Sequence, residues 1–66
     1  MINAFETRLD LASRLAAWMV APRFAPVRVW RWQREVHALA RATNQPVTVV
    51  VRGLVQDALV LTEGEA

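Results

Sequence analysis

Three prolines set where helices can begin and end in this chain. Pro22 and Pro46 each follow a segment with helical periodicity, and the residue before a proline is pushed out of the α region of backbone space. Pro26 has the fixed φ that suits the first turn of a helix. The sequence therefore predicts a helix over 3–21, a short linker, and a second helix over 26–43.

The first predicted helix begins with a capping pattern and carries two apolar stripes. Asn3 is followed three residues later by Glu6, which is typical of an N-cap and its reciprocal partner. Asp10 and Arg14 are spaced to form an ion pair across one turn. The main stripe consists of Phe5, Leu9, Ala12, Ala16 and Met19, and a second stripe of Leu11, Leu15 and Trp18 lies alongside it. We expect this broad face to be buried.

The second predicted helix has its own stripe, made of Val29, Trp32, Val36 and Leu39. We expect it to pack antiparallel against the first helix, with these residues meeting Phe5, Leu9, Ala12, Leu15, Ala16 and Met19. Arg31 and Glu35 are spaced for an ion pair. The stretch 27–32 is rich in β-branched and aromatic residues and could instead be extended, but the periodicity favours helix.

After Pro46 the character of the sequence changes. Val47 to Val51 is the strongest strand signal in the chain. We predict strands over 47–52 and 58–62, joined by a turn between Arg52 and Asp57, and an acidic tail over 63–66. A short third helix over Leu54–Leu61 is the alternative. The expected fold is α+β, mainly α: one small domain over 1–66, with an antiparallel helical hairpin followed by a C-terminal β-hairpin.

Size and composition leave few ways to stabilise such a fold. Among 66 residues there is no cysteine and one histidine, His37, so disulfides and thiolate metal sites are excluded. Hydrophobic residues make up 55% of the chain, which is more than a small core can hide. Oligomerisation, a partner chain or unusually tight packing remains to stabilise a domain of this size.

The strongest candidate for a binding surface is the stretch 23–41. It holds five arginines against Glu35 alone, a local charge of five minus one, +4. Trp30 and Trp32 are interleaved with them, so that Arg34 and Arg28 can each lie over an indole ring one helical turn away. Trp32 belongs to the buried stripe, whereas Trp30 is expected to be half exposed. The predicted partner-binding residues are Arg28, Trp30, Arg31, Arg34, His37 and Arg41.

Three kinds of partner fit this surface, and a protein chain fits best. Trp and Arg are enriched at binding hot spots, and the partner can be a second copy or another protein. The alternative is nucleic acid, since Arg contacts phosphate and Trp stacks on bases. Membrane binding is disfavoured because the helix is already used to close a core. A second predicted site is the strand edge at Val47, Val49, Val50 and Val51, which could pair with another chain.

The side chains available for catalysis are few. The chain has no Cys or Tyr, one His and one Ser, and its two glycines are isolated, so neither a nucleophile with its base nor a phosphate-binding loop is found. We expect no enzyme activity, cofactor, metal or small-molecule substrate. No secretory signal or membrane span is recognisable. The sequence predicts a cytoplasmic interaction or assembly module of a bacterial or phage complex, or a protein within a phage particle.

Overall fold

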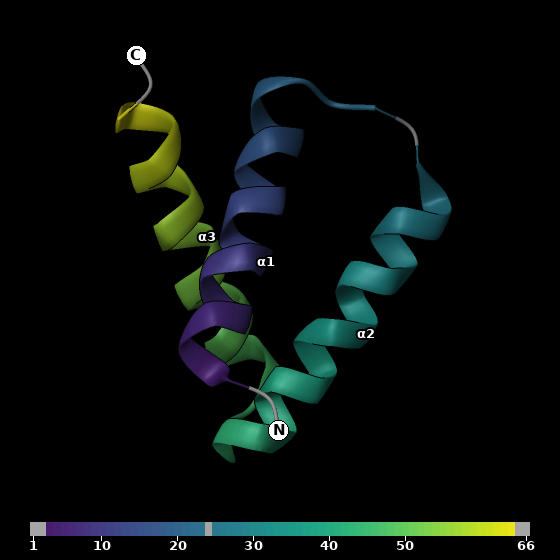
Figure 1. Ribbon diagram of the computed structural model, residues 1–66, viewed down its shortest axis with the longest axis vertical. Coiled ribbons are helices and arrows are strands. Elements are labelled where there is room, and N and C mark those ends of the chain that lie inside the picture. The colour runs from purple at the N-terminus through teal and green to yellow at the C-terminus, as the bar shows by residue number, and fades with distance from the viewer. Residues whose placement is uncertain (1–2, 24, 65–66) are drawn as a thin grey trace.

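A computed structural model describes residues 3–23 and 25–64, and this part of the chain contains three α-helices and no strand. The helices are α1 (Ala4–Val20), α2 (Pro26–Thr43) and α3 (Val47–Gly64). α1 and α3 lie side by side and run in the same direction, while α2 runs the opposite way (Figure 1). The backbone of α2 lies closest to the other two helices at its C-terminal end and diverges from them toward its N-terminal end (Figure 1).

The helix boundaries confirm the signals read from the prolines and from Asn3. The Asn3 side chain accepts a hydrogen bond of 3.2 Å from the Glu6 amide at the start of α1. α1 ends one residue before its C-cap, Ala21, and α2 begins at Pro26. Asn44 caps α2 in the left-handed conformation, with φ 54° and ψ 44°, which asparagine adopts more readily than most residues.

The predicted β-hairpin is wrong, because residues 47–64 form one continuous helix. The expected strands over 47–52 and 58–62 both lie in α3, and the expected turn between Arg52 and Asp57 is helix interior. The structure is therefore a three-helix bundle rather than an α+β fold. The alternative helix over 54–61 was correct in kind but too short. Of the predicted acidic tail, residues 63 and 64 belong to α3, and residues 65–66 lie outside the described residues.

Packing explains why a valine-rich segment is helical here. Val50, Leu54 and Ala58 recur every four residues and are all buried, so a helix places them on one face against the other two helices. The helix penalty of valine is only about 0.7 kcal/mol or less per residue. Burial of a Val or Leu side chain contributes about 1.5–3 kcal/mol, and therefore outweighs the β-propensity of the segment.

The core uses only part of the broad apolar face expected on α1. Ala12 and Ala16 of the main stripe and Leu11 of the second stripe are buried, whereas Phe5, Leu9 and Met19 of the main stripe are exposed. Leu15 and Trp18 of the second stripe are partly buried and pack against the core. The buried residues of the whole core are Leu11, Ala12, Ala16, Trp32, Val36, Leu39, Ala40, Val50, Leu54 and Ala58. Val29, also predicted to be buried, is exposed.

Trp32 on α2 contacts α1 through a hydrogen bond and an aromatic pair. Its indole Nε1–H donates a hydrogen bond of 3.0 Å to the carbonyl oxygen of Leu11. Its ring meets the ring of Trp18 edge to face, with centroids 6.1 Å apart and an interplanar angle of 66°. Edge-to-face geometry is favourable for aromatic pairs, and a buried Trp needs a partner for its N–H. One side chain thus satisfies both requirements and closes the α1/α2 interface.

We expect Gly53→Ala to stabilise the protein by about 0.5 kcal/mol, since alanine is favoured over glycine by about 0.5–1 kcal/mol in a helix interior. A Cβ at this position would lie 3.0 Å from an Nη atom of Arg8, the far end of a flexible side chain. Arg8 pairs with Asp57 at 2.9 Å in an exposed position, and a shift of such a pair costs little. Urea denaturation measures the change.

Gly64→Ala is the control for this substitution, because Gly64 is the last residue of α3 and has open space around it. It should change the urea midpoint less than Gly53→Ala. A Gly53→Ala protein less stable than the wild type would show that Arg8 is held rigidly over the glycine, contrary to the expectation.

No helix in the described part of the chain is long and apolar enough to cross a membrane.

Candidate functional site

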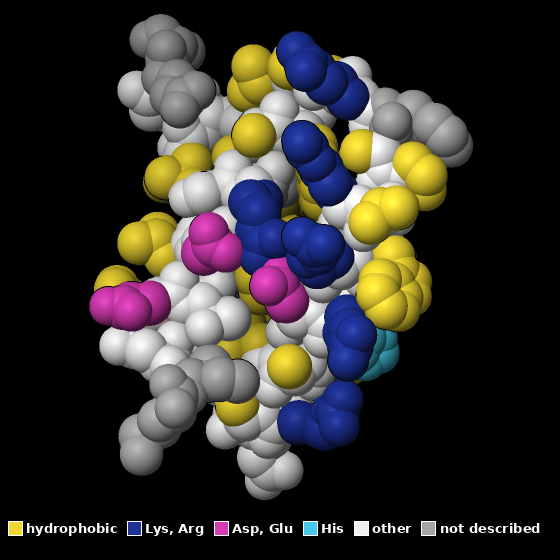
Figure 2. Space-filling view, turned by 45° about the vertical axis from the view of Figure 1, so that its right-hand side comes forward, with side chains coloured by type: hydrophobic (Ala, Val, Ile, Leu, Met, Phe, Trp, Pro, Cys, Tyr) yellow, Lys and Arg dark blue, Asp and Glu magenta, His cyan; other side chains and the backbone are white. Residues whose placement is uncertain are grey.

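The outer surface of α2 gathers four of the six residues predicted to bind a partner. Trp30, Arg34, His37 and Arg41 follow one another at spacings of four, three and four, which places them on one helix face. All four are exposed, on the side of α2 away from its buried residues. We call these four residues the cationic face. Figure 2 shows dark-blue arginine side chains gathered along one side of the molecule, with the cyan histidine beside them.

Trp30 and Arg34 form the cation–π pair that the sequence predicted. The Arg34 guanidinium carbon lies 5.5 Å from the centroid of the Trp30 ring, within the range for this interaction. Trp30 remains 60% exposed, so most of the indole is available to a ligand. The second predicted pair, Arg28 over Trp32, is not found among the described residues, and Trp32 is buried against Trp18 instead.

Arg28 and Arg31 lie apart from the cationic face, at the junction of α2 with α1. Together with Arg14, Ala17 and Trp18 they line a hollow of about 270 Å³. Both arginines are exposed. The six predicted residues therefore cover two neighbouring surfaces of α2 rather than one continuous patch.

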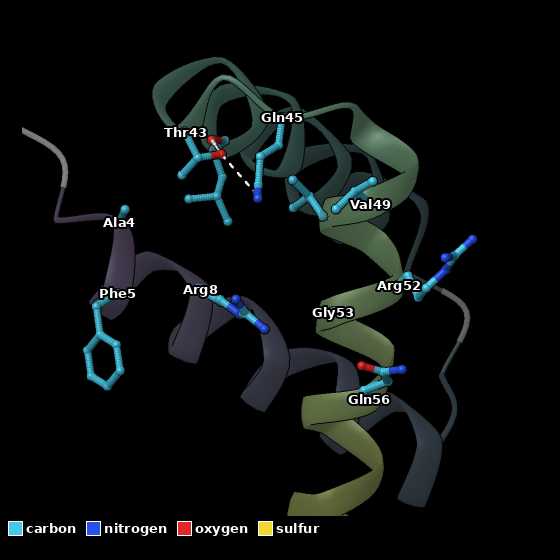
Figure 3. Close-up of a pocket in the computed structure, with 11 residues that line it drawn as sticks. Ala4, Phe5, Arg8, Thr43, Gln45, Val49, Arg52, Gly53 and Gln56 are labelled. Atoms are coloured by element: carbon cyan, nitrogen blue, oxygen red, sulfur yellow. Dashed lines mark hydrogen bonds between the residues drawn. The ribbon is translucent and has the colours of Figure 1, made fainter.

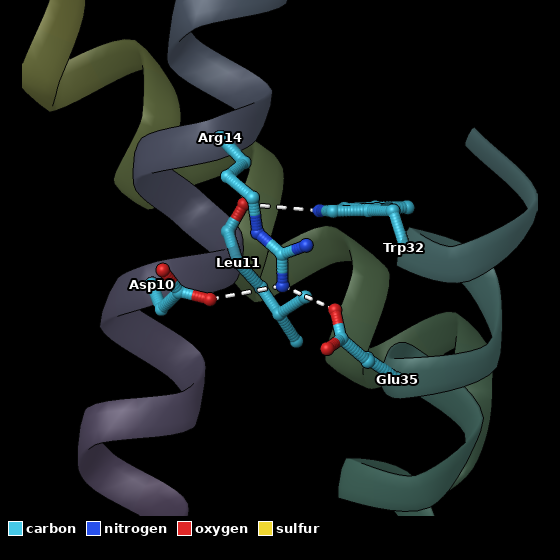
Figure 4. Close-up of polar contacts among 5 residues, drawn as sticks. All are labelled: Asp10, Leu11, Arg14, Trp32 and Glu35. Carbon is cyan, nitrogen blue, oxygen red and sulfur yellow. Dashed lines mark hydrogen bonds and ion pairs between the residues drawn. The ribbon is translucent and has the colours of Figure 1, made fainter. Parts of the chain in front are cut away.

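Arg14 pairs with Glu35, the one acidic residue in the stretch 23–41, so that Glu35 does not neutralise an arginine of α2. Its guanidinium lies between two carboxylates and pairs with Asp10 at 2.9 Å and with Glu35 (Figure 4). The predicted pair of Asp10 with Arg14 is thus confirmed. The predicted pair of Arg31 with Glu35 is wrong, because Glu35 turns toward α1 and meets Arg14 there.

Most arginines consequently have no carboxylate partner in the described part of the chain. Among the described residues, ion pairs within 4 Å involve only two arginines, Arg8 and Arg14. The remaining six are Arg23, Arg28, Arg31, Arg34, Arg41 and Arg52. Four of them lie on α2, which makes this helix the most strongly positive element of the described structure.

A second surface, which the sequence did not single out, crosses α1 and α3. Phe5 and Leu9 on α1 and Val49 on α3 are exposed and line two hollows that share Phe5 and Arg8, and we call these three residues the apolar face. Phe5 is 76% exposed. The sequence predicted Phe5 and Leu9 to lie in the core and Val49 to lie in a strand. No signal in the sequence separates Phe5 and Leu9 from Ala12 and Ala16, which belong to the same stripe and are buried.

A hollow of about 410 Å³ adjoins the apolar face. It is lined by residues of all three helices, among them Arg8, Leu39, Val49 and Gly53. Figure 3 shows Phe5 at its rim with the ring directed away from it, while Arg8 reaches across toward Gly53. A protruding aromatic ring and a hollow with apolar residues in its lining therefore lie next to each other on the same side of the molecule.

The predicted strand edge is wrong, because its residues lie in the helix α3. Val50 is buried in the core, Val47 and Val51 pack against it, and Val49 is exposed on α3. Their backbone groups belong to α3, so there is no strand edge at which another chain could pair.

Within residues 3–23 and 25–64, no three His, Cys, Asp or Glu side chains are grouped so as to hold a metal ion, and Ser13 and His37 are both exposed.

Known proteins offer no guide to the chemistry of these surfaces. No protein-family model, curated protein or solved structure matches this chain.

Proposed function

We propose that the protein is a small binding and assembly module that associates with a second copy of itself through the apolar face. The observation that carries the proposal is the exposed Phe5 beside the hollow at α1 and α3. In a two-fold symmetric pair, the same patch meets itself. The Phe5 ring of each copy can then enter the hollow of the other, because knob and hollow belong to one surface.

The energetics support burial of this face. Three large apolar side chains are exposed there, and aromatic residues, Phe included, are enriched in the buried centres of protein interfaces. Burial of apolar area contributes about 25 cal/mol per Å², so removing Phe5 and its neighbours from water is a substantial gain.

The cationic face is poorly suited to the same role. A two-fold interface through α2 would place Arg34 and Arg41 of one copy near the same residues of the other. Like charges across an interface are repulsive, and the nearest carboxylate on α2, Glu35, is engaged by Arg14. Self-association through α1 and α3 leaves this surface free.

We also propose that the module is part of a larger assembly in the cytoplasm or within a phage particle. We assign it a binding role rather than a catalytic one. The few side chains suited to catalysis support the binding role: Ser13 and His37 are the sole serine and histidine of the chain, and each is exposed.

Light scattering after size exclusion tests self-association. We expect a mass of about twice the 7.5 kDa of one chain. Phe5→Glu should weaken the dimer by about 30-fold or more, because loss of a hot-spot residue costs about 2 kcal/mol or more, and it should leave the helical circular dichroism signal unchanged.

Val27→Glu is the matched control, since Val27 is 66% exposed on α2 and gains the same charge. It should leave the dimer intact. A monomer at every concentration, or equal weakening by both substitutions, contradicts the proposal.

A further inference from the structure

We propose that two neighbouring surfaces of α2, the cationic face and the surface of Arg28 and Arg31, together bind the phosphate backbone of nucleic acid. This function is separate from self-association, because it uses another helix and other side chains. Figure 2 shows the dark-blue arginine side chains following one another over the length of the molecule on this side. The proposal depends on their spacing, their lack of partners and the exposure of Trp30.

The arrangement of charge fits a polyanion better than a single anionic group. Arg28 and Arg41 are thirteen residues apart on α2, about 20 Å along a helix that rises 1.5 Å per residue. Arg31 and Arg34 lie between them, and none of the four has a carboxylate partner among the described residues. A nucleic-acid strand presents phosphates repeatedly over such a length, and a guanidinium can donate two hydrogen bonds to each.

The aromatic side chain of the cationic face adds to the case for nucleic acid. Trp and Arg are also common at protein interfaces, so the proposal depends on the run of arginines without carboxylate partners among the described residues. Trp30 stands among them with its ring largely exposed and one guanidinium over it. Such a ring is a platform for a nucleobase, and base–aromatic stacking tolerates any sequence.

Fluorescence anisotropy with two labelled probes of random sequence tests the proposal: a single strand and a duplex, each about 16 nucleotides or base pairs long. We expect the logarithm of the association constant to fall linearly with the logarithm of the salt concentration between about 50 and 200 mM. The slope should be about −0.7 per contacted phosphate for the single strand and about −0.9 for the duplex. The probe with the lower Kd identifies the form of nucleic acid that the protein prefers.

Variants separate phosphate contact from stacking. Arg34→Ala and Arg41→Ala should each weaken binding of all sequences and reduce the salt slope by about 1. Trp30→Ala should weaken single-strand binding by about tenfold while the slope is unchanged, since it removes stacking and no charge. Because these side chains are exposed, the fold should be retained, and circular dichroism confirms it for each variant.

Arg52→Ala is the matched control, because it removes the same charge from α3, where Figure 3 shows the side chain turned away from the hollow. It should change binding less than threefold, with the dimer mass measured in parallel. The proposal is overturned by the absence of binding to both probes at low salt, by equal weakening in Arg52→Ala and Arg34→Ala, or by binding of poly-glutamate without binding of either probe.

Discussion

Trp32→Ala should unfold most of the protein at room temperature or leave it with a melting temperature lower by about 15 °C or more. Truncation of a buried Trp costs about 3–5 kcal/mol, and a chain of this length has a total stability of about 3–10 kcal/mol. Trp32 is 9% exposed, donates its indole N–H to the Leu11 carbonyl, and packs on Trp18. Thermal unfolding followed by far-ultraviolet circular dichroism measures the loss.

Trp30→Ala controls for the loss of an indole as such. Trp30 lies two residues away on the same helix and is 60% exposed, and its cation–π contact with Arg34 is worth about 0.5–1 kcal/mol. Its melting temperature should fall by only a few degrees. Trp32→Phe should lie between the two, because an aromatic ring remains while the hydrogen bond to Leu11 is lost. If Trp32→Ala melts as Trp30→Ala does, the placement of Trp32 at the α1/α2 interface is wrong.

The contrast between these two tryptophans shows what the sequence could predict. Their positions relative to Val36 and Leu39 identified Trp32 as buried and Trp30 as exposed, and both placements are confirmed. The limits of α2 were equally accessible, because a proline at one end and Asn44 with Pro46 at the other are local signals. Such features depend on a few neighbouring residues and so can be read without knowledge of the fold.

The exposed part of the main stripe of α1 could not be predicted in the same way. This stripe is regular, but Ala12 and Ala16 in it are buried while Phe5, Leu9 and Met19 are exposed, and periodicity alone does not show which part of a stripe a neighbouring helix covers. The choice is made by contacts with distant residues: the Leu11 carbonyl receives the Trp32 N–H, and Arg8 reaches Asp57. Both partners lie far along the chain, so the apolar face followed only from the three-dimensional arrangement.

In the candidate site, too, contacts within one helix could be predicted from the sequence and contacts between helices could not. The arginines of α2 and the pair of Trp30 with Arg34 were visible in the sequence, because helical spacing determines which side chains are neighbours. The pairing of Glu35 with Arg14 was not, since it joins two helices. That pairing bears on the proposed phosphate contacts, because it leaves Arg31 without the carboxylate that local spacing had assigned to it.

Val55→Pro distinguishes the helical α3 from the hairpin that its valines suggested. Residue 55 lies in the middle of α3 and is exposed, so the substitution removes little buried surface. In a helix interior, proline deletes one backbone hydrogen bond and clashes with the preceding turn, which costs about 3 kcal/mol or more. In a hairpin, residue 55 would fall in the turn between Arg52 and Asp57, where proline is well tolerated. We therefore expect Val55→Pro to lose most of its helical signal.

Val55→Ala is the companion variant, because alanine removes the same side chain while favouring helix. It should keep the wild-type circular dichroism spectrum and a melting temperature within a few degrees of the wild type. Urea denaturation of the two variants then isolates the backbone effect from the loss of the valine side chain. A Val55→Pro protein as stable as Val55→Ala would mean that residues 47–64 are not one helix. Such a result would also contradict the packing of Val50, Leu54 and Ala58 into the core from a single face of α3.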